Sequence, residues 1–222
     1  TPLGLFAEWD RRVTDVLNEV RARARTGVSA PAEIVDVRQT LDGLRLVKDA
    51  HELALMRRAA QISAKAHRRA MERTRAGWHE YQVEAELAHE FLSSGAQAVA
   101  YSPIVAGGPN ACVLHYRDNN RQLQDGELLL IDAGCEYHGY ASDITRTFPA
   151  SGKFTPRQRE VYQLVLDAQR AAEKAFVLGK SSIADLQRVA KEVMKSSPLR
   201  DKQGNTLDKY FIHGLGHWIG MD

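Results

Sequence analysis

Two aspartates form the pair of side chains in this sequence best suited to hold a metal ion. Asp132 lies near the end of the apolar run 128–133, where an ionised carboxylate is costly unless a cation or hydrogen-bond donors compensate it. Alone, Asp132 could equally cap the turn before Gly134. Asp143 follows eleven residues later, a spacing that suits two adjacent antiparallel strands with both carboxylates on one face. A divalent cation would remove their repulsion, although a salt bridge to Arg146 is the simpler alternative.

Two histidines in a glycine-rich segment would complete such a site. His213 and His217 are four residues apart, and glycines at 214, 216 and 220 allow neighbouring groups to approach closely. A lone buried histidine is more often a hydrogen-bonded core residue than a ligand. With the two aspartates upstream, one imidazole as a ligand becomes the better interpretation. Two carboxylates and an imidazole suit manganese, and cobalt or zinc would also fit.

Three further residues have weaker functional signals. His115 follows a glycine turn at 107–110 and lies on a predicted short strand, where it could also be a plain surface histidine. Tyr101 could face a substrate, although a core position is the default. Cys135 follows the Asp-Ala-Gly turn, and without a local histidine partner it is interpreted as a small buried filler.

The elements that would position these residues follow from apolar periodicity and turn residues. Helices are predicted over 4–25, from Asp49, over 79–93, and after the capping residues Thr155 and Ser182. Strands are predicted over 98–106, 113–116, 128–133, 143–148 and 210–213, and the run at 128–133 reads as buried on both faces. The order helix, helix, strand occurs twice, which indicates a faint internal duplication.

Composition sets the broad class. The chain has 222 residues, 44% of them hydrophobic and 26% charged, as expected of a globular protein with a packed core. A net charge of +2 gives no reason to expect a nucleic acid or a membrane surface as a partner. Two cysteines cannot form a disulfide framework, which fits a cytoplasmic setting. No apolar run approaches the roughly 18–20 residues that cross a bilayer.

Four segments together resemble one family, the pita-bread metallopeptidases, and within it the Xaa-Pro aminopeptidases. They are 100–116, 130–137, 140–149 and 213–222. The resemblance implies an α+β pita-bread fold that is incomplete at its C-terminal side. Residues 1–45 would be the remnant of an N-terminal domain with its linker, and 46–222 the first part of the catalytic domain.

The resemblance also implies a role for each matching residue. Asp132 would bind one metal ion, Asp143 would bridge two, and His217 would ligate the second. His213 would help to hold the substrate, and His115 would lie over the scissile bond. Tyr101 would contact the substrate. The reaction would be hydrolysis by a hydroxide that two metal ions activate, Mn²⁺ above all, releasing the first residue of peptides whose second residue is proline.

One departure qualifies this expectation. The family has two further ligands, both glutamates, downstream of the His213–His217 segment, and this chain does not contain them. We therefore expect residues 1–222 alone to be inactive unless a complementing C-terminal fragment supplies the missing ligands. The intact protein is expected to be a homo-oligomer. Prolidase, which acts on dipeptides, and a non-catalytic pita-bread binding module are the alternatives, while methionine aminopeptidase and creatinase fit the motifs less well.

Overall fold

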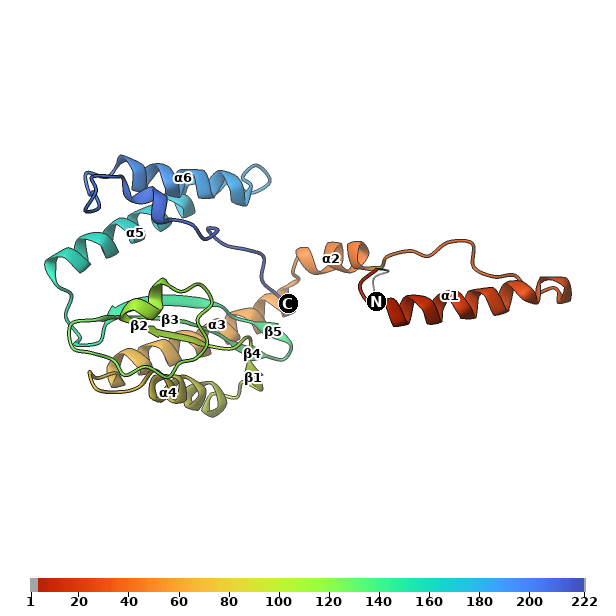
Figure 1. Cartoon of the computed structure of the whole chain (residues 1–222), viewed down its shortest axis with the longest axis horizontal. Coiled ribbons are helices and arrows are strands. Elements are labelled where there is room, and N and C mark those ends of the chain that lie inside the picture. The colour runs from red at the N-terminus through yellow and green to blue at the C-terminus, as the bar shows by residue number, and fades with distance from the viewer. Residues whose placement is uncertain (1–3, 222) are drawn as a thin grey trace. The chain divides into compact units, whose positions relative to one another are not determined.

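The structure is a computed structural model that describes residues 4–221, and the chain divides into two compact units, Thr1–Asp49 and Ala50–Asp222. The first unit holds α1 (Ala7–Ala22), the short 3-10 helix η1 (Ala24–Thr26) and α2 (Arg38–Leu46) (Figure 1). The helix predicted over 4–25 is confirmed in a shorter form. Helix α2 was not predicted from the sequence.

The second unit is built from two small antiparallel sheets and two pairs of helices. One sheet has the order β2 (Ile104–Gly107), β3 (Leu128–Ala133), β6 (Ile144–Pro149), and the other the order β1 (Ala98–Val99), β4 (Cys135–Tyr137), β5 (Tyr140–Ala141). The helices are α3 (Ala50–Arg73), α4 (Glu80–Ser93), α5 (Pro156–Ala175) and α6 (Ile183–Ser196), with 3-10 turns η2 (Gly108–Cys112) and η3 (Leu207–Tyr210).

Local sequence signals start the last two helices. Thr155 and Gln158 form a reciprocal capping box before α5: the Gln158 amide donates to Thr155 Oγ1 at 3.3 Å, and the Thr155 amide donates to Gln158 Oε1 at 2.9 Å. Ser182 and Asp185 do the same for α6. Each box satisfies two backbone N–H groups that a helix start leaves without partners, which is why these starts could be predicted.

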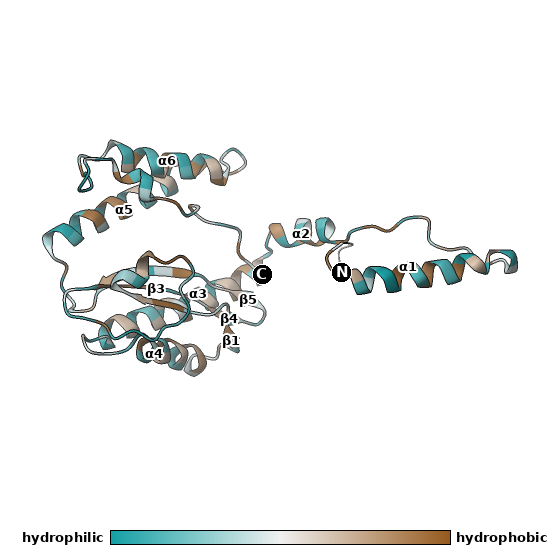
Figure 2. Cartoon of the chain, viewed as in Figure 1, coloured by the Kyte–Doolittle hydropathy of each residue, from teal (hydrophilic) through white to brown (hydrophobic). Residues whose placement is uncertain are grey.

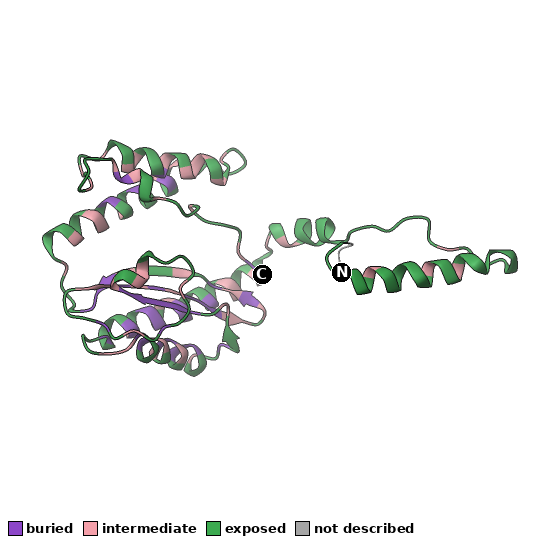
Figure 3. Cartoon of the chain, in the orientation of Figure 1, coloured by how far each residue is buried: buried purple, intermediate pink, exposed green. Residues whose placement is uncertain are grey.

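The main core lies between α3, α4 and the sheets (Figures 2 and 3). Helix α3 contributes small side chains at helical spacing, so that α4 and strand β3 can approach it closely. The largest fully buried apolar side chains are Phe91, Ile62, Leu87, Leu123, Leu129 and Ile131. Helices α5 and α6 pack against each other around a second, smaller cluster of Ala168, Ala172 and Ala190.

Four strand predictions need correction. Strand β3 is not buried on both faces, because its burial alternates between full and partial along the strand. The strand predicted over 98–106 breaks after Val99 and resumes at Ile104, in the other sheet. Residues 113–116 form no strand, since His115 has a φ of 55°, outside the extended region. Residues 210–213 also form no strand, so the second half of the suggested duplication lacks its strand.

A close approach of two backbone segments fixes the connection between β3 and β6. A Cβ added to Gly134 would lie 1.6 Å from the carbonyl oxygen of Ser142, so no other residue fits there without moving the backbone. Cys135, next to it, is fully buried, which confirms it as a filler residue. Among the described residues, no helix is long and apolar enough to cross a membrane.

Candidate metal and peptide site

The two predicted aspartates converge at one end of the sheet β2-β3-β6. Asp132 lies on β3 opposite Thr145 of β6, and Asp143 directly precedes β6. Tyr101 lies in the break between β1 and β2, and its hydroxyl lies 2.6 Å from Asp132 Oδ1 and 2.8 Å from Asp143 Oδ1. One hydroxyl thus lies within hydrogen-bond distance of both carboxylates, so the two aspartates lie close together.

Burial and the neighbouring carboxylates affect the titration of Asp132 and Tyr101. The pKa of Asp132 is raised, first because burial disfavours its charged form and also because the charge of Asp143 is near, although the Tyr101 hydroxyl acts against this. The pKa of Tyr101 is raised well above its usual value, mainly by burial and then by its hydrogen bond to Asp132. Asp132 and Tyr101 are thus half-buried beside a second carboxylate, and a cation would stabilise negative charge in such a place.

His217 completes this group from a distant part of the chain. Its Nε2 lies 3.2 Å from Asp143 Oδ2, and its Nδ1 lies 2.8 Å from the carbonyl oxygen of Trp218. Since a carbonyl only accepts, Nδ1 donates to it, and Nε2 is the ring nitrogen that faces the carboxylate. An Nδ1–H bonded to a backbone carbonyl orients the ring and leaves Nε2 as the nitrogen that can bind a metal ion. A backbone bond from Ala141 N to Gly220 O, 2.8 Å long, holds the histidine segment beside the aspartates.

His115 and His213 form a second group. Their rings meet edge to face with centroids 6.1 Å apart, although they are almost one hundred residues apart in the sequence. Both side chains are exposed, and His213 Nδ1 is 2.8 Å from the Gly214 carbonyl oxygen. Because His213 is only four residues from His217, a peptide bound to these rings would lie close to the aspartates.

The ligand atoms at this site are of the types that bind a hard divalent cation, but the described residues offer too few of them. Two carboxylates that share one proton donor, with an imidazole nitrogen beside them, offer the oxygen-rich ligands that manganese prefers. Within residues 4–221, however, no three histidine, cysteine or acidic side chains are arranged to hold an ion by themselves. Tyr101 occupies the position between the carboxylates with its hydroxyl, which supplies part of the compensation that a cation would give.

The sequence interpretation missed the buried polar residues that support the site. His67, on α3, lies behind β3, where its Nε2 donates to the carbonyl oxygen of Ala133 at 3.1 Å. Burial lowers the pKa of His67, which favours the neutral ring. The hydroxyls of Ser63 and Ser142 are 2.8 Å apart, and both accept from the amide of Cys135. The available signal was the placement of Ser63 and His67, four residues apart, on the apolar face of α3.

Replacing Tyr101 by phenylalanine should destabilise the metal-free protein by about 1 to 2 kcal/mol, because two neighbouring carboxylates then lose a shared hydrogen-bond donor. Urea unfolding of the protein that contains this chain, stripped of metal with a chelator, would measure the change. Tyr81→Phe is the matched control, because Tyr81 has an exposed side chain on α4. An unchanged unfolding midpoint for Tyr101→Phe would show that the hydroxyl does not stabilise the pair.

Comparison with known proteins places the chain in a family. Residues 54–222 match the model of Metallopeptidase family M24. The chain belongs to this family. It is 42% identical to an Xaa-Pro aminopeptidase of Escherichia coli (strain K12) over 229 aligned residues, which cover 99% of the chain and 52% of that protein.

Solved structures give the same result. Proline aminopeptidase P II from Yersinia pestis matches with a TM-score of 0.89 and 45% identity, over 100% of this chain and 53% of that one. A zinc-substituted E. coli aminopeptidase P in complex with product also matches with a TM-score of 0.89, at 40% identity, over 100% and 52%. The resemblance inferred from the four segments and the α+β pita-bread fold are confirmed. This M24 chain spans about half the length of the relatives it matches.

Proposed function

We propose that the protein to which this chain contributes is a metalloaminopeptidase that removes the first residue from peptides with proline in the second position. The observation that carries this proposal is the convergence of Asp132 and Asp143 on one hydroxyl, with Nε2 of His217 turned toward Asp143. The names of the relatives support an aminopeptidase rather than prolidase or a non-catalytic module.

In this proposal Asp132, Asp143 and His217 hold two divalent cations, Mn²⁺ in preference to Co²⁺ or Zn²⁺, together with ligands from outside this chain. When bound, the cations supply an activated water and polarise the carbonyl group that is attacked. The carboxylates would neutralise the charge of the ions and fix their place, and the Trp218 carbonyl, at Nδ1 of His217, would orient the ring so that Nε2 is the ligating nitrogen.

The two other histidines would act on the peptide. His115 is proposed to hydrogen-bond the developing oxyanion or the proline nitrogen at the scissile bond, and His213, against its ring, to hold the substrate. Tyr101, with its hydroxyl at the carboxylates, is proposed to contact the substrate as well. The intact protein is proposed to be a cytoplasmic homo-oligomer.

The function is tested with the full-length protein and a tripeptide that has proline in second position. We expect hydrolysis of its first peptide bond, at least about a hundredfold faster than with alanine in second position, because the site recognises the proline ring. A chelator should abolish the activity and Mn²⁺ should restore it, while residues 1–222 alone should be inactive. Equal cleavage of the alanine peptide, or cleavage of the Xaa-Pro dipeptide alone, would contradict the proposal.

A further inference from the structure

A buried carboxylate at the start of α4 lies outside the group of residues so far given a role. Glu80 is the first residue of α4, and its side chain is fully buried. We propose that Glu80 is a positioning residue, which holds the segment 107–121 so that His115 points into the peptide site. The inference rests on the proposed function, because that function gives His115 its place beside the scissile bond.

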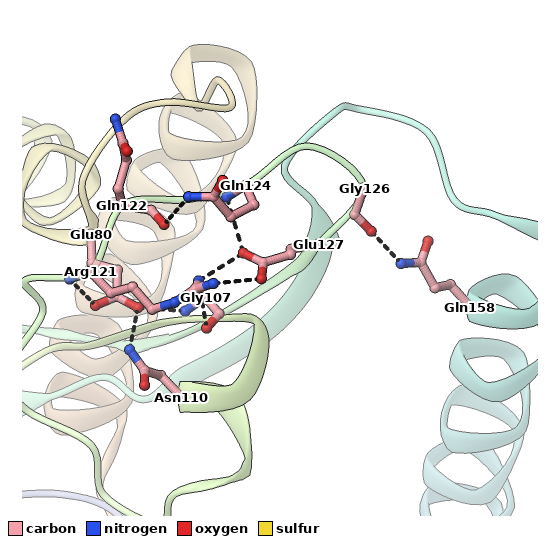
Figure 4. A network of polar contacts seen from close by, with 9 residues as sticks. All are labelled: Glu80, Gly107, Asn110, Arg121, Gln122, Gln124, Gly126, Glu127 and Gln158. Carbon is pink, nitrogen blue, oxygen red and sulfur yellow. Dashed lines mark hydrogen bonds and ion pairs between the residues drawn. The ribbon is translucent and has the colours of Figure 1, made fainter.

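Both oxygens of Glu80 accept hydrogen bonds from this one segment. Oε1 accepts from the Gly107 amide at 2.7 Å and from Asn110 Nδ2 at 3.0 Å. Oε2 accepts from the Tyr116 hydroxyl at 2.7 Å and from the Arg121 amide at 2.9 Å. Figure 4 shows Glu80 between the side chain of Asn110 and the backbone of Gly107 and Arg121. These four donors fill the acceptor positions of a carboxylate.

The arrangement of these bonds fixes the chain on both sides of His115. One oxygen holds the part before His115, and the other holds Tyr116, its direct neighbour, and the end of the segment. His115 itself has a φ of 55°, a conformation that a residue with a side chain adopts rarely and keeps only where its surroundings impose it. The bond from Tyr116 to Glu80 supplies such a constraint one residue away.

Further contacts hold the two ends of the segment. The Arg121 guanidinium makes a paired contact with Glu127, with distances of 2.7 and 2.6 Å (Figure 4). Gly108 packs so closely on Glu127 that a Cβ there would lie 2.4 Å from its Oε1. Asn119 accepts from the amide of Val105 at 2.9 Å, which joins the end of the segment to β2. Polar contacts therefore hold both ends of the segment, and Glu80 bonds to each end through the backbone amides of Gly107 and Arg121.

The chemistry of the four partners requires a carboxylate. All four are N–H or O–H donors to Glu80, so a glutamine there would aim its NH₂ group at two of them. The Tyr116 hydroxyl can turn and accept from that NH₂ group, but the Arg121 amide cannot accept and would lose its partner. Glu80→Gln thus changes few atoms and loosens the segment beside His115.

The test uses the full-length, metal-loaded protein and the tripeptide with proline in second position, with the variants Glu80→Gln, His115→Ala and both together. We expect Glu80→Gln to lower kcat about tenfold to a hundredfold and to leave KM within about twofold, because misplacement of a group at the scissile bond affects the chemical step. In the His115→Ala background the same change should lower kcat less than about twofold, since it acts through His115.

Glu90→Gln is the matched control. Glu90 is a carboxylate on the same helix, 6% exposed, and its partners are Lys65 and Ser94 rather than the segment that carries His115. Its replacement should leave kcat unchanged in both backgrounds. If the effects of Glu80→Gln and His115→Ala on kcat multiply instead, or if folded Glu80→Gln has normal kcat, the positioning role is refuted.

A gentler variant and a spectroscopic measurement keep the inference testable if Glu80→Gln does not fold. Tyr116→Phe removes one hydroxyl and leaves Glu80 in place, and it should lower kcat about threefold to tenfold. The ring signal of His115, identified by its absence in His115→Ala, should shift in the nuclear magnetic resonance spectra of Tyr116→Phe and Glu80→Gln but not of Glu90→Gln. An unmoved signal in folded Tyr116→Phe would refute the inference.

The spectra need no turnover, so the two proposals can fail separately. A shifted His115 signal in a protein that hydrolyses no Xaa-Pro peptide would overturn the proposed function and leave the positioning role supported. Normal hydrolysis with an unmoved signal and unchanged kcat in the folded Glu80 and Tyr116 variants would overturn the positioning role alone.

Discussion

Under the proposed function, replacing Asp143 by asparagine is expected to lower the rate of Xaa-Pro hydrolysis by the full-length protein on the order of a thousandfold or more, because losing the proposed bridging ligand would remove several kcal/mol of transition-state stabilisation. Asparagine keeps the shape of the side chain and an oxygen that can accept from Tyr101. Its neutral amide, however, lacks the charge and the second oxygen with which a carboxylate would bridge two cations. Both metal content and rate should therefore fall.

Metal analysis of the purified variant would check this result together with the rate. Asp125→Asn is a suitable control, because Asp125 is an exposed acid in the turn before β3, at the opposite end of that strand from Asp132. The control should keep both the metal and the activity of the unaltered protein. Metal content that stays unchanged in Asp143→Asn would contradict its assignment as a bridging ligand.

Replacing Phe91 by alanine should destabilise the protein by about 3 to 5 kcal/mol, the usual loss when a large buried aromatic side chain is removed from a core. Phe91 is 1% exposed on the inner face of α4 and belongs to the main core with Leu87 and Ile62. The expected loss is large because α3, α4 and the sheet all contribute to this core, and the cavity cannot be filled by one small shift.

The next residue provides an internal control. Leu92 is 64% exposed on the outer face of the same helix, so Leu92→Ala should change the free energy of unfolding by less than about 0.5 kcal/mol. Urea unfolding followed by far-ultraviolet circular dichroism would measure both variants in the full-length protein. Similar midpoints for the two variants would show that the core described for α4 is wrong.

The sequence predicted those parts of the fold that depend on local signals. The starts of α5 and α6 follow from Thr155 and Ser182, whose side chains bond to backbone only three residues away. The pairing of β3 with β6 follows from an apolar run and a short connection. Since both aspartates lie at the same end of that pair, their convergence could be predicted as well.

The parts that were not predicted depend on distant partners. The chain around His115 looks like a strand by composition, but Glu80 holds it in another conformation through bonds from more than twenty-five residues away. Tyr101 was predicted to lie in the core or to face a substrate. Its hydroxyl instead lies beside two carboxylates that are 31 and 42 residues away in the sequence, in the break between β1 and β2. No periodicity encodes such contacts.

The pairing of β2, β3 and β6 has a consequence for the order in which the site is assembled. These strands all lie within residues 104–149, whereas His217 comes much later in the sequence. A chain leaves the ribosome from its N-terminus, so the two carboxylates can meet before the histidine has been synthesised. Tyr101 precedes both aspartates in the sequence, so its hydroxyl is available to both carboxylates during that interval. Under the proposed function, the carboxylate pair and its shared hydroxyl would therefore form before the histidine ligand joins them.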